Sequence, residues 1–370
     1  MEESLVNPPI PKFLQETANA IGGIAGVEAV AWGGSAAMGV ADAHSDFDFY
    51  VYTNAPVSDE NRRSIIAERS RHSQLNNTFW ELEDEWIDQE NRRFNAMYRA
   101  CDFVLGEVAA RLDGYSADLG YTTAYCFSVA NGYILYDPRQ WLATLRQRLS
   151  QPLPEPLVRS ILAKNRPVLG GGMQSCYLAQ MKAAIARGDL ISLNHRVAVW
   201  IASYTDILFA VNRTYHPGEK RLLAYMQGLS DLPEKALEDV PRLCALAGSL
   251  SSPIIEHVAG MLERLDLWLT GNGCEGATRN SLQIFRSFGA GVFWDRYLGL
   301  KPQAESSSPF GTKIGTGAYQ SPITSDFSVP LPCGRPSAEL SFSLTWLTRL
   351  FISICILNTP SWMARFGSLT

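Results

Sequence analysis

The sequence lacks the cysteine patterns that mark a disulfide framework or a zinc site. Its seven cysteines are odd in number and irregularly spaced, and none forms a C-x-x-C pair. Structural zinc sites use closely spaced cysteine pairs, and small secreted domains use even sets of cysteines. We therefore expect reduced thiols in a cytoplasmic protein.

The sequence also shows no long apolar run, and we expect no signal peptide at its start. Its most apolar segment, LTWLTRLFISICIL at residues 344–357, contains Arg349 and is too short for a membrane span. The first residues, MEESLVNPPIPKF, are acidic, whereas a signal peptide starts with basic residues before an apolar run. We expect no contact with a membrane.

An excess of positive charge is absent as well. The 32 lysines and arginines are outnumbered by 37 aspartates and glutamates, for a net charge of −5. Domains that bind long nucleic acids need clustered lysines and arginines, so we do not expect such a partner. A small anionic substrate such as a nucleotide would need a metal ion or a few well-placed cations.

What is present indicates an α+β domain followed by a helical one. Up to about residue 150, strand and helix patterns are mixed, and beyond the proline-rich SQPLPEP at 150–156 helical patterns dominate. We expect domains at residues 1–150 and 151–300, and an irregular or disordered tail at 301–370, which is rich in Ser, Pro and Gly. The expected helices are 11–24, one capped by Ser58, 104–111, one after Pro138, 175–188, 194–215, 219–228 and 253–269; the expected strands are 27–32, 46–52, two within 77–99, and 122–130.

One stretch, AWGGSAAMGVADAHSDFDFYVY at residues 31–52, carries a pattern with chemical meaning. Asp46 and Asp48 are two residues apart on a predicted strand, so both carboxylates lie on one face. Carboxylate oxygens are ligands of Mg²⁺, which also binds substrate phosphates. The alternative is that these aspartates form the wet face of an ordinary strand.

A glycine turn precedes this strand. Gly33 and Gly34 lack Cβ atoms and let the backbone approach a ligand closely, Ser35 offers a hydroxyl, and a helix start after the turn favours an anion. The turn is not a P-loop, because no Gly-Lys-Ser/Thr follows it. Together, turn and strand predict a site for a metal-bound nucleoside triphosphate.

The order G-G-S, ten residues, D-x-D resembles the signature of the nucleotidyltransferase superfamily, which includes DNA polymerase β and the aminoglycoside nucleotidyltransferases. FWELEDEWID, FNAMYRACDFV, GYILYDP and NRTYHPGEKR are further similar to a bacterial family that joins such a domain to a helical domain of unknown function, over residues 10–298. The resemblance implies a nucleotidyltransferase-type mixed sheet with a helical C-terminal domain. The matching positions are Gly33, Gly34, Ser35, Ser45, Asp46 and Asp48.

The implied reaction is the Mg²⁺-dependent transfer of a nucleoside monophosphate from an NTP to a hydroxyl of a small molecule or protein. Asp46 and Asp48 would be the catalytic metal ligands, and the Gly-Gly-Ser turn and Ser45 would hold the nucleotide. Arg99 and Lys220 could contact its phosphates, with a surface salt bridge and a solvated helix end as the alternatives. His216, close to Lys220, is a further candidate.

The chain departs from the family at one position. Active members carry a third carboxylate where this sequence has Asn95, which is neutral and a poor base. Either transfer is impaired and the protein is a nucleotide-binding sensor or interaction partner, or another carboxylate takes the place of the third one. Glu83, Asp84 and Asp88, which we expect in the turn before Asn95, are candidates; for Asp84 the alternative is an ordinary turn residue. A weaker alternative is a structural domain with no nucleotide site.

Overall fold

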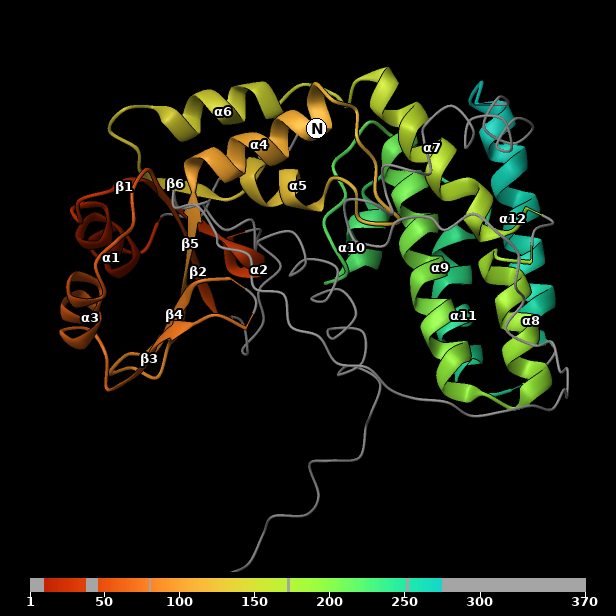
Figure 1. Ribbon diagram of the computed structural model, residues 1–370, viewed down its shortest axis with the longest axis horizontal. Coiled ribbons are helices and arrows are strands. Elements are labelled where there is room, and N and C mark those ends of the chain that lie inside the picture. Colours follow the sequence, from red (N-terminus) through yellow and green to blue (C-terminus); the bar gives the residue numbers. More distant parts are fainter. Residues whose placement is uncertain (1–9, 38–45, 80, 172–173, 251–252, 275–370) are drawn as a thin grey trace, which may run out of the picture. The chain divides into compact units, whose positions relative to one another are not determined.

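A six-stranded mixed sheet forms the first part of the molecule (Figure 1). The computed structural model describes residues 10–37, 46–79, 81–171, 174–250 and 253–274. The sheet has the order β3-β4-β5-β2-β1-β6; β2 and β5 run parallel, and the other neighbouring pairs are antiparallel. The strands are β1 (Val27–Gly33), β2 (Phe47–Thr53), β3 (His72–Asn77), β4 (Glu83–Ile87), β5 (Arg93–Ala100) and β6 (Tyr133–Tyr136).

Helices accompany the sheet and then replace it. Those of the first part are α1 (Lys12–Gly22), α2 (Gly34–Ala37), α3 (Asp59–Ala67), α4 (Cys101–Leu112), α5 (Ala124–Ala130) and α6 (Trp141–Leu149). They are followed by α7 (Glu155–Leu169), α8 (Tyr177–Arg187), α9 (Leu190–Val211), α10 (Leu222–Gln227), α11 (Ala236–Ala247) and α12 (Pro253–Gly271). The expected α+β class with a mixed sheet and a helical second part is confirmed; the proposed domain limits remain predictions.

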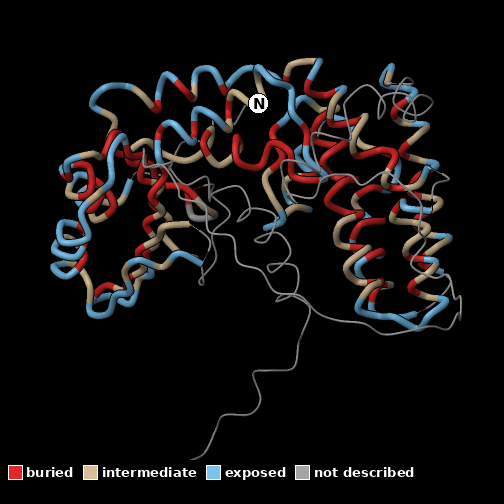
Figure 2. The backbone as a smooth tube through the Cα atoms, in the orientation of Figure 1, coloured by how far each residue is buried: buried red, intermediate tan, exposed pale blue. Residues whose placement is uncertain are grey.

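The two faces of the sheet contribute to different hydrophobic clusters, because successive strand residues point to opposite faces. On one face, Val30, Phe49 and Ala96 pack with Leu14 and Ile21 of α1. On the other, Ala31 and Tyr52 join the large cluster that continues through the later helices. Figure 2 shows the buried residues gathered on the inner sides of these elements.

Local signals place several helix ends where the sequence predicts them. The Ser58 hydroxyl accepts a hydrogen bond from the Asn61 amide at 3.5 Å, and Asp59 and Glu60 lie in the first turn of α3. Helix α8 ends at Gly188, whose φ of 70° is the left-handed conformation that glycine adopts at helix ends.

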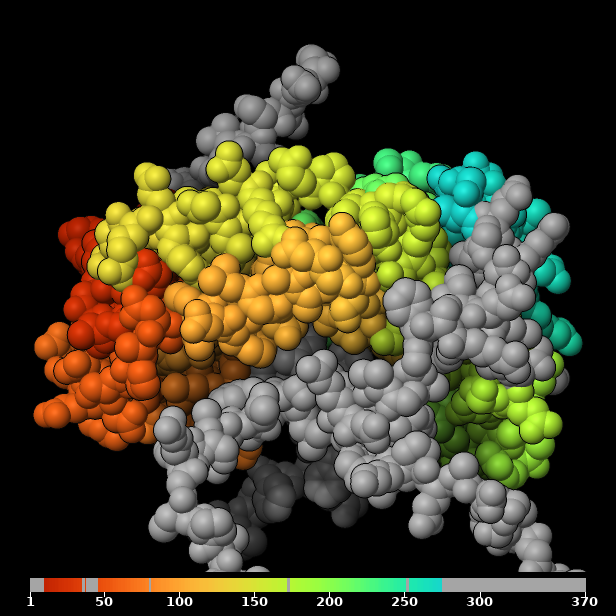
Figure 3. Space-filling view, turned by 45° about the horizontal axis from the view of Figure 1, so that its top comes forward, coloured from red at the N-terminus to blue at the C-terminus, as the bar shows by residue number. Residues whose placement is uncertain are grey.

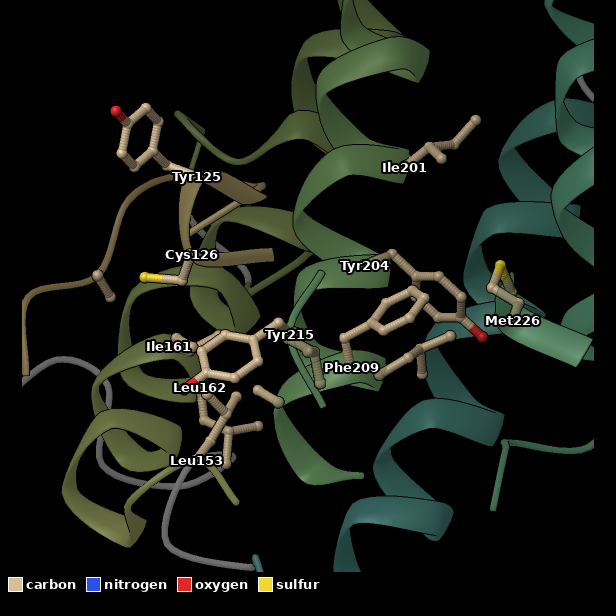
Figure 4. Close-up of a cluster of buried hydrophobic side chains, with 14 of the residues drawn as sticks. Tyr125, Cys126, Leu153, Ile161, Leu162, Ile201, Tyr204, Phe209, Tyr215 and Met226 are labelled. Atoms are coloured by element: carbon tan, nitrogen blue, oxygen red, sulfur yellow. The ribbon is translucent and has the colours of Figure 1, made fainter. Parts of the chain in front are cut away.

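Helix α9 is mostly apolar, and every residue from Trp200 to Ala210 is buried. Trp200 and Tyr204 stack with 5.0 Å between ring centroids, and the Trp200 indole donates to the Leu169 carbonyl at 3.2 Å. Tyr204 and Phe209 belong to a cluster shared with α5, α7 and α10 (Figure 4). Within the described ranges, no helix combines the length and apolar character that crossing a bilayer requires.

One expectation about a strand is wrong, and the edge strand β3 was not expected. Residues 122–130 form helix α5 and not a strand, because Tyr125, Cys126 and Val129 are all buried at helical spacing and packing outweighs their β propensity. The edge strand β3 was missed, since HSQLNN has no apolar alternation and forms by pairing with β4. The expected irregular tail at 301–370 lies outside the described residues.

Asp84 is a structural residue of β4 and not a turn residue. Its side chain is fully buried on the sheet face opposite Asp48, where both of its oxygens accept from Arg62 Nη1 at 2.6 and 2.7 Å. The Asn76 amide also donates to it at 3.0 Å, and Arg62 reaches Asp59 with its other terminal nitrogen. This placement removes Asp84 from the candidates for the missing third carboxylate.

Removal of this carboxylate is expected to destabilise the fold. Asp84→Ala leaves the Arg62 charge buried without its main partner, which should lower the free energy of unfolding by about 3 kcal/mol. Urea unfolding followed by circular dichroism measures this loss. The matched control is Asp59→Ala, because Asp59 is the exposed partner of the same arginine and should shift the midpoint little; equal losses in both variants would contradict the assignment.

Candidate functional site

The glycine turn lies directly against Asp48. Gly33, the last residue of β1, pairs with Asp48 of β2, and Gly34 begins α2 with a φ of 71°. A Cβ on Gly34 would lie 1.9 Å from Asp48 Oδ2, and one on Gly33 would lie 2.2 Å from Tyr50 Cε2. Both positions therefore require glycine, and the backbone turn and the carboxylate form one structural unit.

The two aspartates differ in their surroundings. Asp48 Oδ1 accepts a hydrogen bond of 3.1 Å from the amide nitrogen of Asn95, its neighbour on the parallel strand β5. Asp46 immediately precedes β2, with Oδ1 3.9 Å from Arg93 Nη1. That Asp46 oxygen is buried and has no hydrogen-bond partner in the described part of the chain. Both side chains are half-buried.

Burial raises the pKa of the Asp48 carboxyl to about 6. The Asn95 hydrogen bond and the Lys220 charge lower this pKa, Asp46 raises it further, and Arg99 has a smaller lowering effect. The carboxylate form is thus costly in the absence of a cation. A bound cation would offset that cost.

The donor set fits Mg²⁺. The described residues contain no group of three or more His, Cys, Asp or Glu side chains that could hold a metal. Mg²⁺, however, is commonly held by one or two carboxylates, with water and substrate phosphates completing its shell. Asp46, with its buried unpartnered oxygen, and Asp48 supply those carboxylates.

A carboxylate that the sequence argument missed lies beside Asn95. Glu85 of β4 pairs with Asn95 in the register, so Asp48, Asn95 and Glu85 occupy neighbouring positions of three strands on one sheet face. Glu85 is half-buried, and its Oε1 accepts from Asn77 Nδ2 at 2.7 Å. The alternation of side chains along β4 places Glu85 and Asp84 on opposite faces of the sheet. Only the register between β4 and β5 shows that Glu85 lies beside Asn95.

The other carboxylate candidates have different positions. Glu83 is on the same face as Glu85, opposite Met97. Asp88 stabilises the β4–β5 turn, where its Oδ1 accepts from the amides of Glu90 and Arg92 at 3.0 and 2.9 Å. Asp88 is therefore engaged in turn formation.

Arg99 shares the sheet face of Asp48 but is tied to other groups. It donates to both oxygens of Glu81 at 3.0 and 2.9 Å, and its guanidinium lies 4.1 Å from the centre of the Tyr50 ring. With 8% of its surface exposed, it helps to support the site from within. A phosphate contact by Arg99 remains a prediction.

The loop before α10 contributes Lys220, whereas His216 is fully buried. The Lys220 charge acts on the Asp48 carboxyl, and among the described residues no carboxylate forms an ion pair with this lysine. His216 is 0% exposed, and burial lowers its pKa to about 3, so the ring is neutral. The expectation that His216 could contact a phosphate directly is wrong.

The two serines of the predicted nucleotide site are only partly covered by the described structure. Ser45 lies outside the described residues, and of Ser35 only the backbone, within α2, is described. Trp86 of β4 is 3% exposed and stacks on Phe94, with 5.1 Å between ring centroids, so it belongs to the core.

Comparisons with known proteins give two results. A family model described as "Domain of unknown function (DUF4037)" matches residues 119–222. Among solved structures, the chain is similar to a nucleotidyltransferase-like protein from Exiguobacterium sibiricum 255-15, with 10% identity and a TM-score of 0.38 over 74% of this chain and 80% of that chain. No curated protein matches. The family match ends just after Lys220.

Gly34→Ala is expected to damage the site and the fold together. The new Cβ would overlap Asp48 Oδ2 in a backbone conformation that L-residues rarely adopt, at a cost of about 2 kcal/mol or more. Chemical unfolding measures the loss. Gly106→Ala is the matched control, because a Cβ there meets open space on α4 and should stabilise by about 0.5–1 kcal/mol; a harmless Gly34→Ala would refute the close contact.

Asp48 should also make stability depend on pH. Its folded pKa of about 6 exceeds its ordinary value of 3.8, so the protonated carboxyl favours the folded state, and this stability is lost as pH rises from about 4 to about 6. The loss should be roughly 2 kcal/mol. Comparing unfolding free energies of wild type and Asp48→Asn across this range isolates the effect, since other groups titrate in both proteins. Parallel curves would contradict the raised pKa.

Proposed function

We propose that the protein is a Mg²⁺-dependent nucleotidyltransferase that moves a nucleoside monophosphate from an NTP onto a hydroxyl of an acceptor. One observation carries this proposal: the glycine turn after β1 is built against the Asp48 carboxylate so closely that no Cβ fits between them. A ligand at this carboxylate would meet the turn backbone at the same time. Such a combination suits a metal-bound triphosphate.

The roles follow from the positions of the side chains. Asp46 and Asp48 would hold Mg²⁺, which neutralises phosphate charge when bound. The backbone at Gly33 and Gly34, with Ser35 and Ser45, would hold the triphosphate. Lys220 would add a cation at the phosphates.

In the transfer step, the acceptor oxygen forms a bond to the α-phosphorus, the bond from that phosphorus to the bridging oxygen breaks, and pyrophosphate leaves. The acceptor proton must pass to a base. Asn95 cannot take it, because an amide is not basic. The carboxylates of Asp48 and Glu85 flank Asn95 on the same sheet face and are the candidates.

A second function is favoured by Asn95 itself. Its amide donates to Asp48 where the resembled family carries a carboxylate. A protein that binds nucleotide without transferring it, as a sensor or interaction partner, would retain the turn and the aspartates. For either function, the net charge of −5 makes a small molecule or a protein a better partner than long nucleic acid. We also propose that the protein acts in the cytoplasm and does not contact a membrane.

Nucleotide binding is the first test. Calorimetry with ATP, GTP, CTP and UTP, with and without Mg²⁺, should show metal-dependent binding by the wild type. The Asp46→Ala/Asp48→Ala variant should lose it by at least about tenfold, because carboxylate ligands are removed. Asp59→Ala serves as a control for loss of a carboxylate elsewhere, on the exposed start of α3. Absence of Mg²⁺-dependent binding in the wild type would overturn both functions.

Asn95→Asp distinguishes the two functions. Pyrophosphate release, measured with a panel of hydroxyl acceptors, should rise in this variant if the asparagine has impaired a former enzyme. An active wild type that Asn95→Asp leaves unchanged, but that Asp46→Ala inactivates, would favour a live enzyme in which another carboxylate serves as the base.

A further inference from the structure

The segment between α9 and α10, residues 212–221, contains three residues with left-handed backbone angles. Arg213, Gly218 and Arg221 have φ values of 57°, 96° and 56°. Non-glycine residues rarely adopt this left-handed conformation, and they persist in it when surrounding contacts determine it. The segment must therefore be fixed by interactions with the rest of the protein.

His216 supplies those interactions from the middle of the segment. Its backbone amide donates to Thr123 Oγ1 at 2.8 Å, and its Nδ1 accepts from the Gly218 amide at 3.0 Å. Because Nδ1 accepts, the proton is on Nε2, which lies 3.0 Å from Thr205 Oγ1. The Thr205 hydroxyl in turn donates a hydrogen bond to the Ile201 carbonyl at 2.9 Å. The neutral ring is thus fully hydrogen-bonded in one tautomer.

Packing holds the same residue from its faces. The His216 ring meets Tyr121 edge-on at 4.9 Å and Phe209 at 4.8 Å between centroids. The neighbouring Tyr215 is buried in the cluster that contains Ile161 and Leu162 (Figure 4). The first half of the segment is therefore anchored in the protein interior.

The anchored half leads directly to an exposed cation. Lys220 follows Gly218 by two residues, and Gly218 is the residue whose amide is bound by the imidazole. Lys220 is exposed. Helix α10 begins two residues after it and packs Tyr225 edge-on against Phe127 of α5, with 5.4 Å between ring centroids; Ser128 of α5 accepts a 3.4 Å hydrogen bond from Arg99, which shares the sheet face of Asp48. Across this contact the Lys220 charge lowers the pKa of the Asp48 carboxyl. A charge carried on a loop can act at a defined point only if the loop backbone is fixed.

We propose that His216 is a positioning residue: through its bond to the Gly218 amide it holds residues 216–221 so that the Lys220 ammonium faces the Asp48 end of the sheet and meets the phosphates of a bound triphosphate. The proposal rests on the proposed function for the identity of the anion. The holding of the segment itself does not depend on it.

Two substitutions separate the bonds of the imidazole. In His216→Asn, the amide oxygen occupies the place of Nδ1 and can still accept from Gly218. In His216→Gln, the amide nitrogen reaches the place of Nε2 and can still donate to Thr205, but the Gly218 bond is lost. Both variants lose the ring and its packing, so each controls for the structural cost of the other.

Trypsin measures the holding of the segment without any ligand. Cleavage after Lys220 and Arg221 under native conditions should be at least about fivefold faster in His216→Gln than in His216→Asn, because exposed bonds are cut from locally opened states. Urea unfolding of both variants corrects for any difference in global stability. Equal corrected rates would overturn the proposal.

Binding tests the consequence at the site. With Mg²⁺ and inorganic tripolyphosphate as the probe, Lys220→Met should raise Kd about tenfold, the loss of one charged contact. His216→Gln should raise it similarly, His216→Asn should stay near the wild type, and His216→Gln should add nothing to Lys220→Met. Additive effects would overturn the proposal. If the wild type binds neither tripolyphosphate nor nucleotide, the proposed function fails, and the trypsin rates alone decide whether His216 holds the segment.

Discussion

The antiparallel pairing of β1 with β2 is the constraint on which the candidate site depends. It sets Gly33 opposite Asp48 and turns the chain at Gly34 immediately beside that carboxylate. The parallel pairing of β2 with β5 then brings Asn95 to the other side of Asp48. These contacts are specified by backbone register and not by side-chain flexibility, so the turn, the carboxylate and the amide cannot move independently. A one-residue slip would send Asp48 to the apolar face that packs on α1.

Local sequence signals predicted some elements of the first part of the molecule, whereas others depend on packing between helices. Strands β1 and β2 are strongly apolar or alternating, and α3 has its own cap, so local signals suffice there. Helix α5 has no such local signal: its aromatic and β-branched residues favour a strand, and burial among neighbouring helices makes it a helix. Figure 3 shows α4 and α6 on the surface of this region, and Arg148 at the end of α6 binds Asp113 at the end of α4.

Within the site, what could be predicted are the residues whose partners are near in the chain. Asp46, Asp48 and the glycines follow from one stretch of sequence. The partner of Arg99 was not predictable, since Glu81 lies in a different strand connection. The position of Glu85 beside Asn95 was not predictable either. The two-residue alternation along a strand shows which of its residues share a sheet face, but it does not show which residues of the next strand lie beside them. That information comes from which strands pair and in which register, and local sequence patterns do not determine either.

Buried polar groups in the helical part fix the positions of the loops that they bind. Asp206 is 1% exposed; it accepts from the amide and hydroxyl of Thr122 and from Asn165, and burial raises its pKa to about 7. Such groups cost free energy unless every bond is made, so they are poor sources of stability but strict determinants of geometry. Asp206 fixes the start of the 122–123 turn, and Thr123 in turn receives the amide of His216. The same bonds thereby fix the backbone from which the Lys220 side chain extends.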